Sequence, residues 1–473
     1  MTPSPLLPLL TIIVGATTVL HATRARRGPL LTPITTTMFI LVSIFGFRPL
    51  FAIADDMHRF YGIDVKDHFN AAARIGFVAV TALSLGYFLS SHRTAPTDDL
   101  SPRADRAPVA FLRMWPSAIV ALGMVAGWMV MVAAYGGGVG FVVELFRGRS
   151  PDTQAGVQGM PIVVSTLPTS ATIVVAAARI QTERTRRLWR GELLAFWATV
   201  AVSCIPPLAL GNRRFLLPSV LAVGLALCLP KWDRRVALRT AVLSGMALLV
   251  LVTIPYVRSE GSRRESDDFI GAVKNYVGDE GVTGAFGQYF LSYDTEMFGY
   301  VSYLDQHLGN DLDHGYGRWA FGDLALAPLP ATMVDSLGLQ SRSDEVMASA
   351  LREGCTTRSC PVPSLPGVLL SDFGELGVAV GLFLVGLLFA RFDRGLRDAG
   401  GARLVAWLTL GGAAPALMRG NTVNQLWLTA NIYLGAALAM WAWARLFPAS
   451  VARPLVDHAA ADERVLAAAG GHE

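Results

Sequence analysis

The chain has 473 residues, of which 52% are hydrophobic and only 16% are charged, and its mean hydropathy is +0.44. These values exclude an ordinary soluble protein and indicate a polytopic membrane protein. The net charge of +4 does not indicate a nucleic-acid partner, because the arginines lie in short clusters between apolar runs. In a membrane protein such clusters determine orientation.

Apolar runs long enough to cross a bilayer as helices recur along the chain, and we predict an all-α fold with about eleven membrane spans. The runs cover approximately 4–22, 31–53, 73–91, 113–135, 160–179, 192–210, 215–230, 238–256, 367–390, 403–419 and 423–446. They predict an N-terminal bundle of about eight helices over 1–256 and a C-terminal group of about three over 367–446. The region 257–366 is the only long polar interval between them.

Basic residues fall in every second connection, at about 24–27, 93–113, 184–190, 231–239 and 391–403. Basic connections stay in the cytoplasm. The alternation therefore predicts an external N-terminus, an extracytoplasmic 257–366 loop and a cytoplasmic tail over 447–473. Because no basic residue precedes the first run, we expect it to be a retained span and not a cleaved signal peptide.

The 257–366 loop carries signs of local structure. Its 284–303 stretch has aromatic and aliphatic residues at helical spacing, which predicts a helix that packs on the membrane domain or lies at the membrane surface. Prolines divide the remainder into short helices joined by turns. Cys355 and Cys360 predict a disulfide on the oxidising side, and a zinc site is disfavoured because no histidine follows at finger-like spacing.

Arginines on the predicted outer side need individual explanations. Arg213 and Arg214 occupy a short connection, Arg419 ends the tenth run, and Arg258 follows the eighth. A guanidinium group offers a planar fork of donors to phosphate oxygens, so these residues are candidates for binding a lipid diphosphate. Snorkelling at the interface and structural ion pairs are the alternatives.

Two further groups suggest chemistry near the end of the loop. Asp372 and Glu375 are three residues apart at the start of an apolar run, where a carboxylate is costly unless it faces a polar cavity. They are candidates for a general base or for ligands of sugar hydroxyls, with structural ion pairing as the alternative. His314, Tyr316 and Arg318 form a glycine-rich aromatic segment that is typical of carbohydrate-binding loops.

Asp55 and Asp56 form an acidic pair after the second run. Such a pair could bind a divalent ion that holds a lipid phosphate, or it could be a solvated loop.

The sequence resembles the O-antigen polymerase (Wzy-type) family of bacterial surface polysaccharides, which join oligosaccharide repeat units. The resemblance rests on Gly211-Asn212-Arg213, on His314-Gly315-Tyr316 and Pro328-Leu329-Pro330, and on the segment from Ser371 to Gly377. It implies transfer between lipid-linked repeat units on the outer face of the cytoplasmic membrane, without metal or other cofactor. O-antigen ligases share this general architecture.

These observations lead us to expect a membrane glycosyltransferase whose substrate is an oligosaccharide on polyprenyl diphosphate. The outer arginines would bind the diphosphate, and Glu375 is the first candidate for the general base, followed by Asp372 and His314. The expected partners are membrane lipid and a chain-length regulator or flippase. The rival hypotheses are a ligase, a metal-dependent transferase that uses polyprenyl-phosphate sugars, and a flippase or exporter.

Overall fold

A computed structural model describes most of the chain. The described residues are 3–24, 32–54, 59–60, 63–92, 112–135, 162–209, 213–228, 297–329, 331–352, 363–420 and 422–447. The predicted span at 238–256 and the proposed Cys355–Cys360 disulfide lie outside these ranges.

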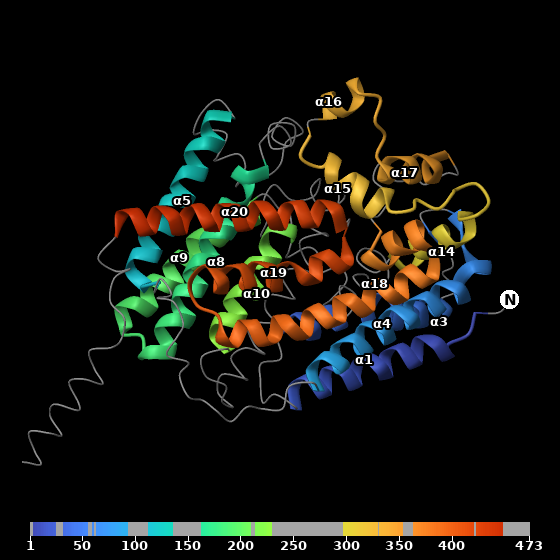
Figure 1. The fold of residues 1–473 in the computed structure, drawn as a ribbon, viewed down its shortest axis with the longest axis horizontal. Coiled ribbons are helices and arrows are strands. Elements are labelled where there is room, and N and C mark those ends of the chain that lie inside the picture. The colour runs from blue at the N-terminus through green and yellow to red at the C-terminus, as the bar shows by residue number, and fades with distance from the viewer. Residues whose placement is uncertain are drawn as a thin grey trace, which may run out of the picture.

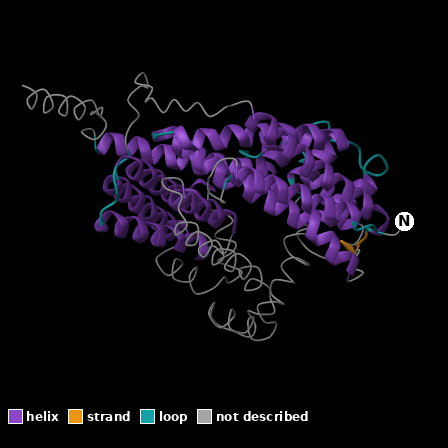
Figure 2. Cartoon of the chain, turned by 90° about the horizontal axis from the view of Figure 1, so that it is seen from below, coloured by secondary structure: helices purple, strands orange, loops and turns teal. Residues whose placement is uncertain are grey.

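The long helices of the described chain account for most of the fold (Figures 1 and 2). They are α1 (Leu6–Arg24), α4 (Phe69–His92), α5 (Met114–Tyr135), α8 (Ile162–Thr185), α9 (Arg190–Ala209), α10 (Arg213–Cys228), α18 (Leu365–Asp398), α19 (Gly401–Arg419) and α20 (Thr422–Leu446). Another continuous helical stretch joins α2 (Pro33–Val42), the π-helical turn η1 (Ser43–Phe47) and α3 (Arg48–Ala54).

The strands β1 (Arg59–Phe60) and β2 (Ile63–Asp64) form an antiparallel pair near the N-terminal end of the molecule, followed by the 3₁₀ turn η2 (Lys66–His68) (Figure 2). Apart from this strand pair the regular structure of the described residues is helical, which is consistent with the all-α fold that the apolar runs predict.

Six helical segments of the described chain are long and apolar enough to cross a membrane, which is consistent with a multi-pass membrane protein. They are Leu6–Thr23, Pro33–Ala54, Lys66–Ser91, Met114–Ala134, Leu365–Asp393 and Thr422–Leu446. Every other predicted apolar run within the described ranges also coincides with a helix, namely α8, α9, α10 or α19. Spanning by these four helices stays a prediction.

The helix α8 is not among the six candidate spans, and it can carry more polar side chains than they do because other helices enclose it. Nearly all its side chains from Val164 to Thr182 are buried, including several Ser and Thr hydroxyls. Two of these hydroxyls donate to neighbouring helices: Thr169 to the Phe215 carbonyl and Ser170 to the Ile432 carbonyl, each at 2.8 Å. With α8 at their centre, α5, α9, α10 and α20 form what we call the second bundle.

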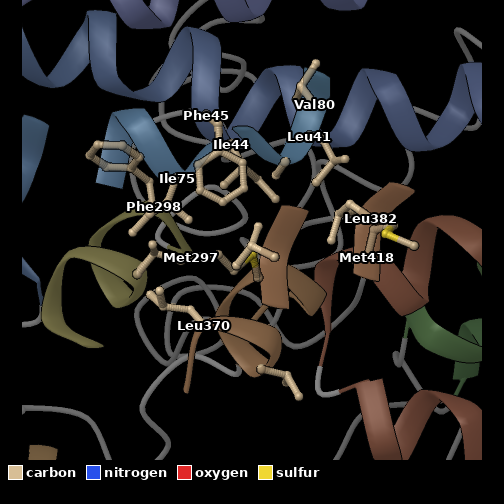
Figure 3. Packing of buried hydrophobic residues seen from close by; sticks show 14 of the residues in the cluster. Leu41, Ile44, Phe45, Ile75, Val80, Met297, Phe298, Leu370, Leu382 and Met418 are labelled. Carbon is tan, nitrogen blue, oxygen red and sulfur yellow. The ribbon is translucent and has the colours of Figure 1, made fainter. Parts of the chain in front are cut away.

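The first bundle consists of α1–α4, α14 (Met297–His307) and α18, and it has its own apolar core (Figure 3). Its closest helix pair is α4 and α18, which lie side by side (Figure 1). A Cβ atom added to Gly86 would overlap the Phe383 carbonyl, and one added to Gly386 would overlap the Leu83 carbonyl. Small residues thus allow the two backbones to touch, as at helix interfaces in membranes. The helix α19 packs against both bundles.

Hydrogen bonds show which helix ends lie together. At one end, the Ser4 N–H donates to the Asn70 amide oxygen at 2.9 Å, joining the starts of α1 and α4. At the other end, Tyr87 donates to Asp393 at 2.8 Å and Arg184 donates to the Ala399 carbonyl at 2.6 Å. We call these the N-terminal end and the opposite end. They group the termini of these helices as the arginine alternation predicts; which end faces outward stays a prediction.

Short helices precede α18 and gather at the N-terminal end (Figure 1). They are α14, the π-helical turn η4 (Arg318–Gly322), α15 (Asp323–Leu326), α16 (Ala331–Ser336) and α17 (Arg342–Arg352). The aromatic face of α14 packs on the membrane-type helices, since the Phe298 ring lies 4.8 Å from that of Phe69 and 6.4 Å from that of Phe45. The described part of the predicted 284–303 helix, from Met297 onward, therefore has the packed arrangement, and residues 284–296 lie outside the described ranges.

Candidate functional site

A kink in α18 creates the site. Gly374 has φ 68° and ψ −166° inside an otherwise regular helix, a backbone conformation that glycine adopts without steric cost. Just before the kink, the Ser371 carbonyl accepts the Gly315 N–H at 2.9 Å and the Asp372 carbonyl accepts the Tyr316 N–H at 3.0 Å. The kink therefore docks the His314-Gly315-Tyr316 segment onto the start of α18.

The docked segment is a tight turn with a strained residue. Tyr316 has φ 47° and Gly317 has φ 89°. Left-handed backbone is uncommon for a bulky residue, and such strain persists only where the surrounding structure enforces it. The Tyr316 side chain is 82% exposed, so burial of its ring does not explain the strain.

Asp372 fixes the other side of this turn. Its side chain is fully buried, and its two carboxylate oxygens accept the backbone N–H groups of Trp319 at 3.2 Å and Ala320 at 2.8 Å. These N–H groups belong to the first turn of η4, where an anion is favoured by the helix dipole and by the unsatisfied donors. Asp372 therefore caps η4 from a neighbouring helix, and this role occupies both of its oxygens.

Asp323 caps the start of α17 in the same way. Its oxygens accept the N–H groups of Arg342 at 2.8 Å and Ser343 at 3.0 Å, at the start of α17. Burial raises the pKa of the Asp323 carboxyl, and the two N–H groups oppose that shift by favouring the ionised form. Two buried carboxylates, Asp372 and Asp323, thus hold the starts of η4 and α17.

Arg342 completes a ring of contacts that runs from α17 back to the His314–Arg318 turn. Its side chain is only 1% exposed, and its guanidinium donates to the Asp313 carbonyl, directly before His314. It also forms an ion pair with Glu345 at 2.9 Å, and Glu345 pairs with Arg318 at 3.6 Å on the far side of the turn. The His314–Arg318 turn is therefore held at both ends by one cluster of charges.

A pocket of about 440 Å³ opens beside this turn. Its polar wall is formed by His314, Tyr316 and Asp372, and its apolar wall by residues of α18: Phe373, Leu376, Gly377 and Val380. The apolar wall continues along the exposed face of α18, where Leu376 is 75% exposed and Val380, Leu384 and Leu388 follow at helical spacing. The apolar wall of the pocket therefore belongs to a helix that is long and apolar enough to cross a membrane.

Two of the three general-base candidates, Glu375 and His314, differ in their surroundings. Glu375 forms an ion pair with Arg74 of α4 and does not line the pocket, so it has the partner that the structural alternative requires. The Nδ1 atom of His314 is buried and has no hydrogen-bond partner among the described residues. A pocket histidine whose ring nitrogen makes no hydrogen bond can accept or donate a proton.

The other predicted site residues lie apart or outside the description. Arg419 ends α19, half-buried, and does not line the pocket. The backbones of Arg213 and Arg214 begin α10, but their side chains are outside the description, as are Arg258 and the Asp55–Asp56 pair. Within the described ranges no group of three His, Cys, Asp or Glu side chains could hold a metal ion.

The sequence did carry one signal for the missed Arg342. It is the first residue of α17, where the helix dipole disfavours a cation and where Asp344 and Glu345 follow as expected. A basic residue in that position suggests a tertiary partner. Asp323 and Arg74 gave no comparable signal, because their partners are 19 and 301 residues away in the chain.

Comparisons with known proteins give no further support, since no protein-family model, no curated protein and no solved structure matches this chain. The resemblance to O-antigen polymerases therefore rests on the motifs quoted above.

Proposed function

We propose that the chain is a membrane glycosyltransferase that joins oligosaccharide repeat units carried on polyprenyl diphosphate, at the outer face of the cytoplasmic membrane. One observation carries the proposal: the pocket has the polar side chains of His314 and Tyr316 on one side and an apolar wall that runs into the exposed face of a candidate span on the other. A substrate with a sugar head and a long hydrocarbon tail matches both walls.

In this proposal His314 is the general base, ahead of Glu375 and Asp372. A hydroxyl of the acceptor glycan attacks the anomeric carbon of the donor, and its proton passes to a ring nitrogen of His314. The bond from the anomeric carbon to the diphosphate oxygen breaks, and the diphosphate leaves with the bonding electrons. His314 is preferred because Glu375 is paired with Arg74 and because both oxygens of Asp372 hold backbone N–H groups.

The leaving diphosphate gains negative charge in the transition state, so fixed cations at that position accelerate the reaction. Arg318 is the proposed cation nearest in sequence to the pocket, and it is exposed enough to reach a ligand while Glu345 orients it. Arg213, Arg214, Arg258 and Arg419 stay proposed ligands of the diphosphate. Tyr316, exposed at the mouth, is the proposed platform for a sugar ring.

The test is transfer by the purified full-length protein supplied with lipid-linked repeat units. The proposal predicts a ladder of lengthened, lipid-linked products that forms equally well with a metal chelator present. A single product on a different lipid acceptor would indicate a ligase, and loss of transfer on chelation would indicate the metal-dependent transferase. Movement of intact substrate across vesicle membranes without new glycosidic bonds would contradict the proposal and indicate a flippase.

A further inference from the structure

A patch of tryptophan and arginine lies at the opposite end of the molecule from the pocket. Trp115, at the start of α5, and Trp189, in the turn between α8 and α9, have ring centroids 6.1 Å apart. Trp115 is 45% exposed and Trp189 is 56% exposed. Two large indoles in contact with each other and open to the surroundings are unusual unless they meet a ligand or an interface.

The depth of the patch follows from α5. Trp115 is the second residue of the candidate span Met114–Ala134, and a span with these bounds would place it where a bilayer's hydrocarbon meets its headgroups. Indole rings favour that depth because they are apolar with one polar N–H. Since Trp189 contacts Trp115, the α8–α9 turn lies at the same depth.

Three arginines lie within two residues of these tryptophans in the sequence. Arg113, Arg187 and Arg190 are exposed, and none of them forms an ion pair with a described carboxylate. The two nearest carboxylates in sequence are already occupied: Glu183 pairs with Arg179 at 3.0 Å, and Glu192 pairs with Arg186 at 2.6 Å. The patch therefore carries positive charge that these carboxylates do not neutralise.

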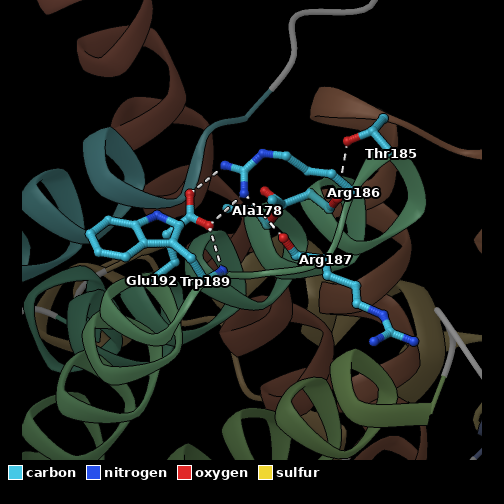
Figure 4. A network of polar contacts seen from close by, with 7 residues as sticks. Ala178, Thr185, Arg186, Arg187, Trp189 and Glu192 are labelled. Carbon is cyan, nitrogen blue, oxygen red and sulfur yellow. Dashed lines mark hydrogen bonds and ion pairs between the residues drawn. The ribbon is translucent and has the colours of Figure 1, made fainter.

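The turn is also held rigidly (Figure 4). Glu192 accepts two bonds from the Arg186 guanidinium, at 2.8 and 2.6 Å, and a third from the Trp189 N–H at 3.3 Å. The Glu192 carboxylate therefore joins the Arg186 side chain to the backbone of Trp189. The Arg187 side chain points away from this network (Figure 4). A ligand of this surface would meet side chains on an ordered turn.

We infer that this patch binds the headgroup of an anionic phospholipid. The guanidinium groups of Arg187 and Arg190, with Arg113, would contact the phosphate, and the Trp115–Trp189 pair would lie against the glycerol and upper acyl chain. The inference concerns the opposite end of the helices from the pocket and does not depend on the proposed function.

The test is native mass spectrometry of the full-length protein in detergent, titrated with phosphatidylglycerol or with phosphatidylcholine. The wild-type protein should bind phosphatidylglycerol more tightly. The Arg187→Gln/Arg190→Gln variant should lose about fivefold in affinity for each arginine removed. Inorganic phosphate in excess should not displace the lipid, because the indoles contact its apolar part.

The matched control is Arg391→Gln/Arg403→Gln, which removes two exposed arginines at the same end of the helices, from α18 and α19 instead of the α8–α9 turn. It should bind phosphatidylglycerol as the wild-type protein does. Equal loss in both double variants would overturn the inference, since any positive charge at this end would then suffice. Equal affinity for the two lipids, or displacement by phosphate, would overturn it as well. Circular dichroism verifies that each variant is folded.

Discussion

The two bundles place their polar groups differently. In the first bundle charged groups lie at the helix ends: Asp372, Asp323 and Arg342 hold the turn beside the pocket at one end, and Asp393 accepts a hydrogen bond from Tyr87 at the other. In the second bundle hydroxyls lie inside, along α8, and donate to carbonyls of α10 and α20. The first arrangement builds a site on rigid helices, and the second joins helices. The role of a polar residue in a membrane helix can therefore be assigned only when its position in the fold is known.

The largest effect should come from Arg342→Ala in the first bundle. Removal of this guanidinium leaves Glu345 without its closest partner and the Asp313 carbonyl without its donor. Truncation of this fully buried side chain, together with the loss of its charge-assisted hydrogen bond, costs about 3–5 kcal/mol. Thermal unfolding of the purified protein measures the change. Arg352→Ala, at the exposed end of the same helix, is the control, and equal melting temperatures for both would refute the ring of contacts.

A smaller effect, still in the first bundle, is expected for Gly86→Ala. The added methyl group would overlap the backbone of α18 at Phe383, so the two helices must separate. Overpacking of this kind costs about 1–3 kcal/mol. Gly123→Ala on α5 is the matched control, because nothing lies within 4 Å of the added atom. If both variants unfold at the same temperature, the close approach of α4 and α18 is incorrect.

Asp323 gives the site end a pH dependence. Burial raises its pKa above the value of an unfolded aspartate, about 4, so the folded protein binds more protons than the unfolded chain between those two values. The free energy of unfolding contributed by this group therefore falls as pH rises through that window, by at most about 1.4 kcal/mol per pH unit. Asp323→Asn should remove this slope. Asp313→Asn, at an exposed carboxylate, should retain it, and an unchanged slope in Asp323→Asn would count against the assignment.

The smallest effect tests the second bundle. Ser170→Ala removes the hydroxyl that joins α8 to the Ile432 carbonyl of α20, which should cost about 1 kcal/mol. Thr17→Ala, whose exposed hydroxyl bonds the Val14 carbonyl of its own helix, should change stability less. A larger loss in Thr17→Ala than in Ser170→Ala would argue against a joining role for the α8 hydroxyls.

The helices could be predicted from the sequence because a long apolar run has few other ways to satisfy its backbone in lipid. Hydropathy did not reveal that α8 is enclosed. Polar residues in a helix are compatible both with burial among other helices and with exposure to water, so the sequence alone does not distinguish the two. At the site, the residue types around His314 and Asp372 suggested chemistry. The capping roles of Asp372 and Asp323 and the ring through Arg342 could not be predicted, because they depend on contacts between segments far apart in the chain.

The central claim, a proton-accepting His314 in the pocket, is tested most directly by single-turnover transfer with lipid-linked repeat units. His314→Gln should lower the rate by about 10²-fold or more with substrate binding and melting temperature nearly unchanged. Glu375→Gln should lower stability through the loss of its pair with Arg74 and leave the rate of the folded protein within about tenfold of wild type. A normal rate in His314→Gln together with a 10²-fold loss in a stable Glu375→Gln would contradict the account and return the role of base to Glu375.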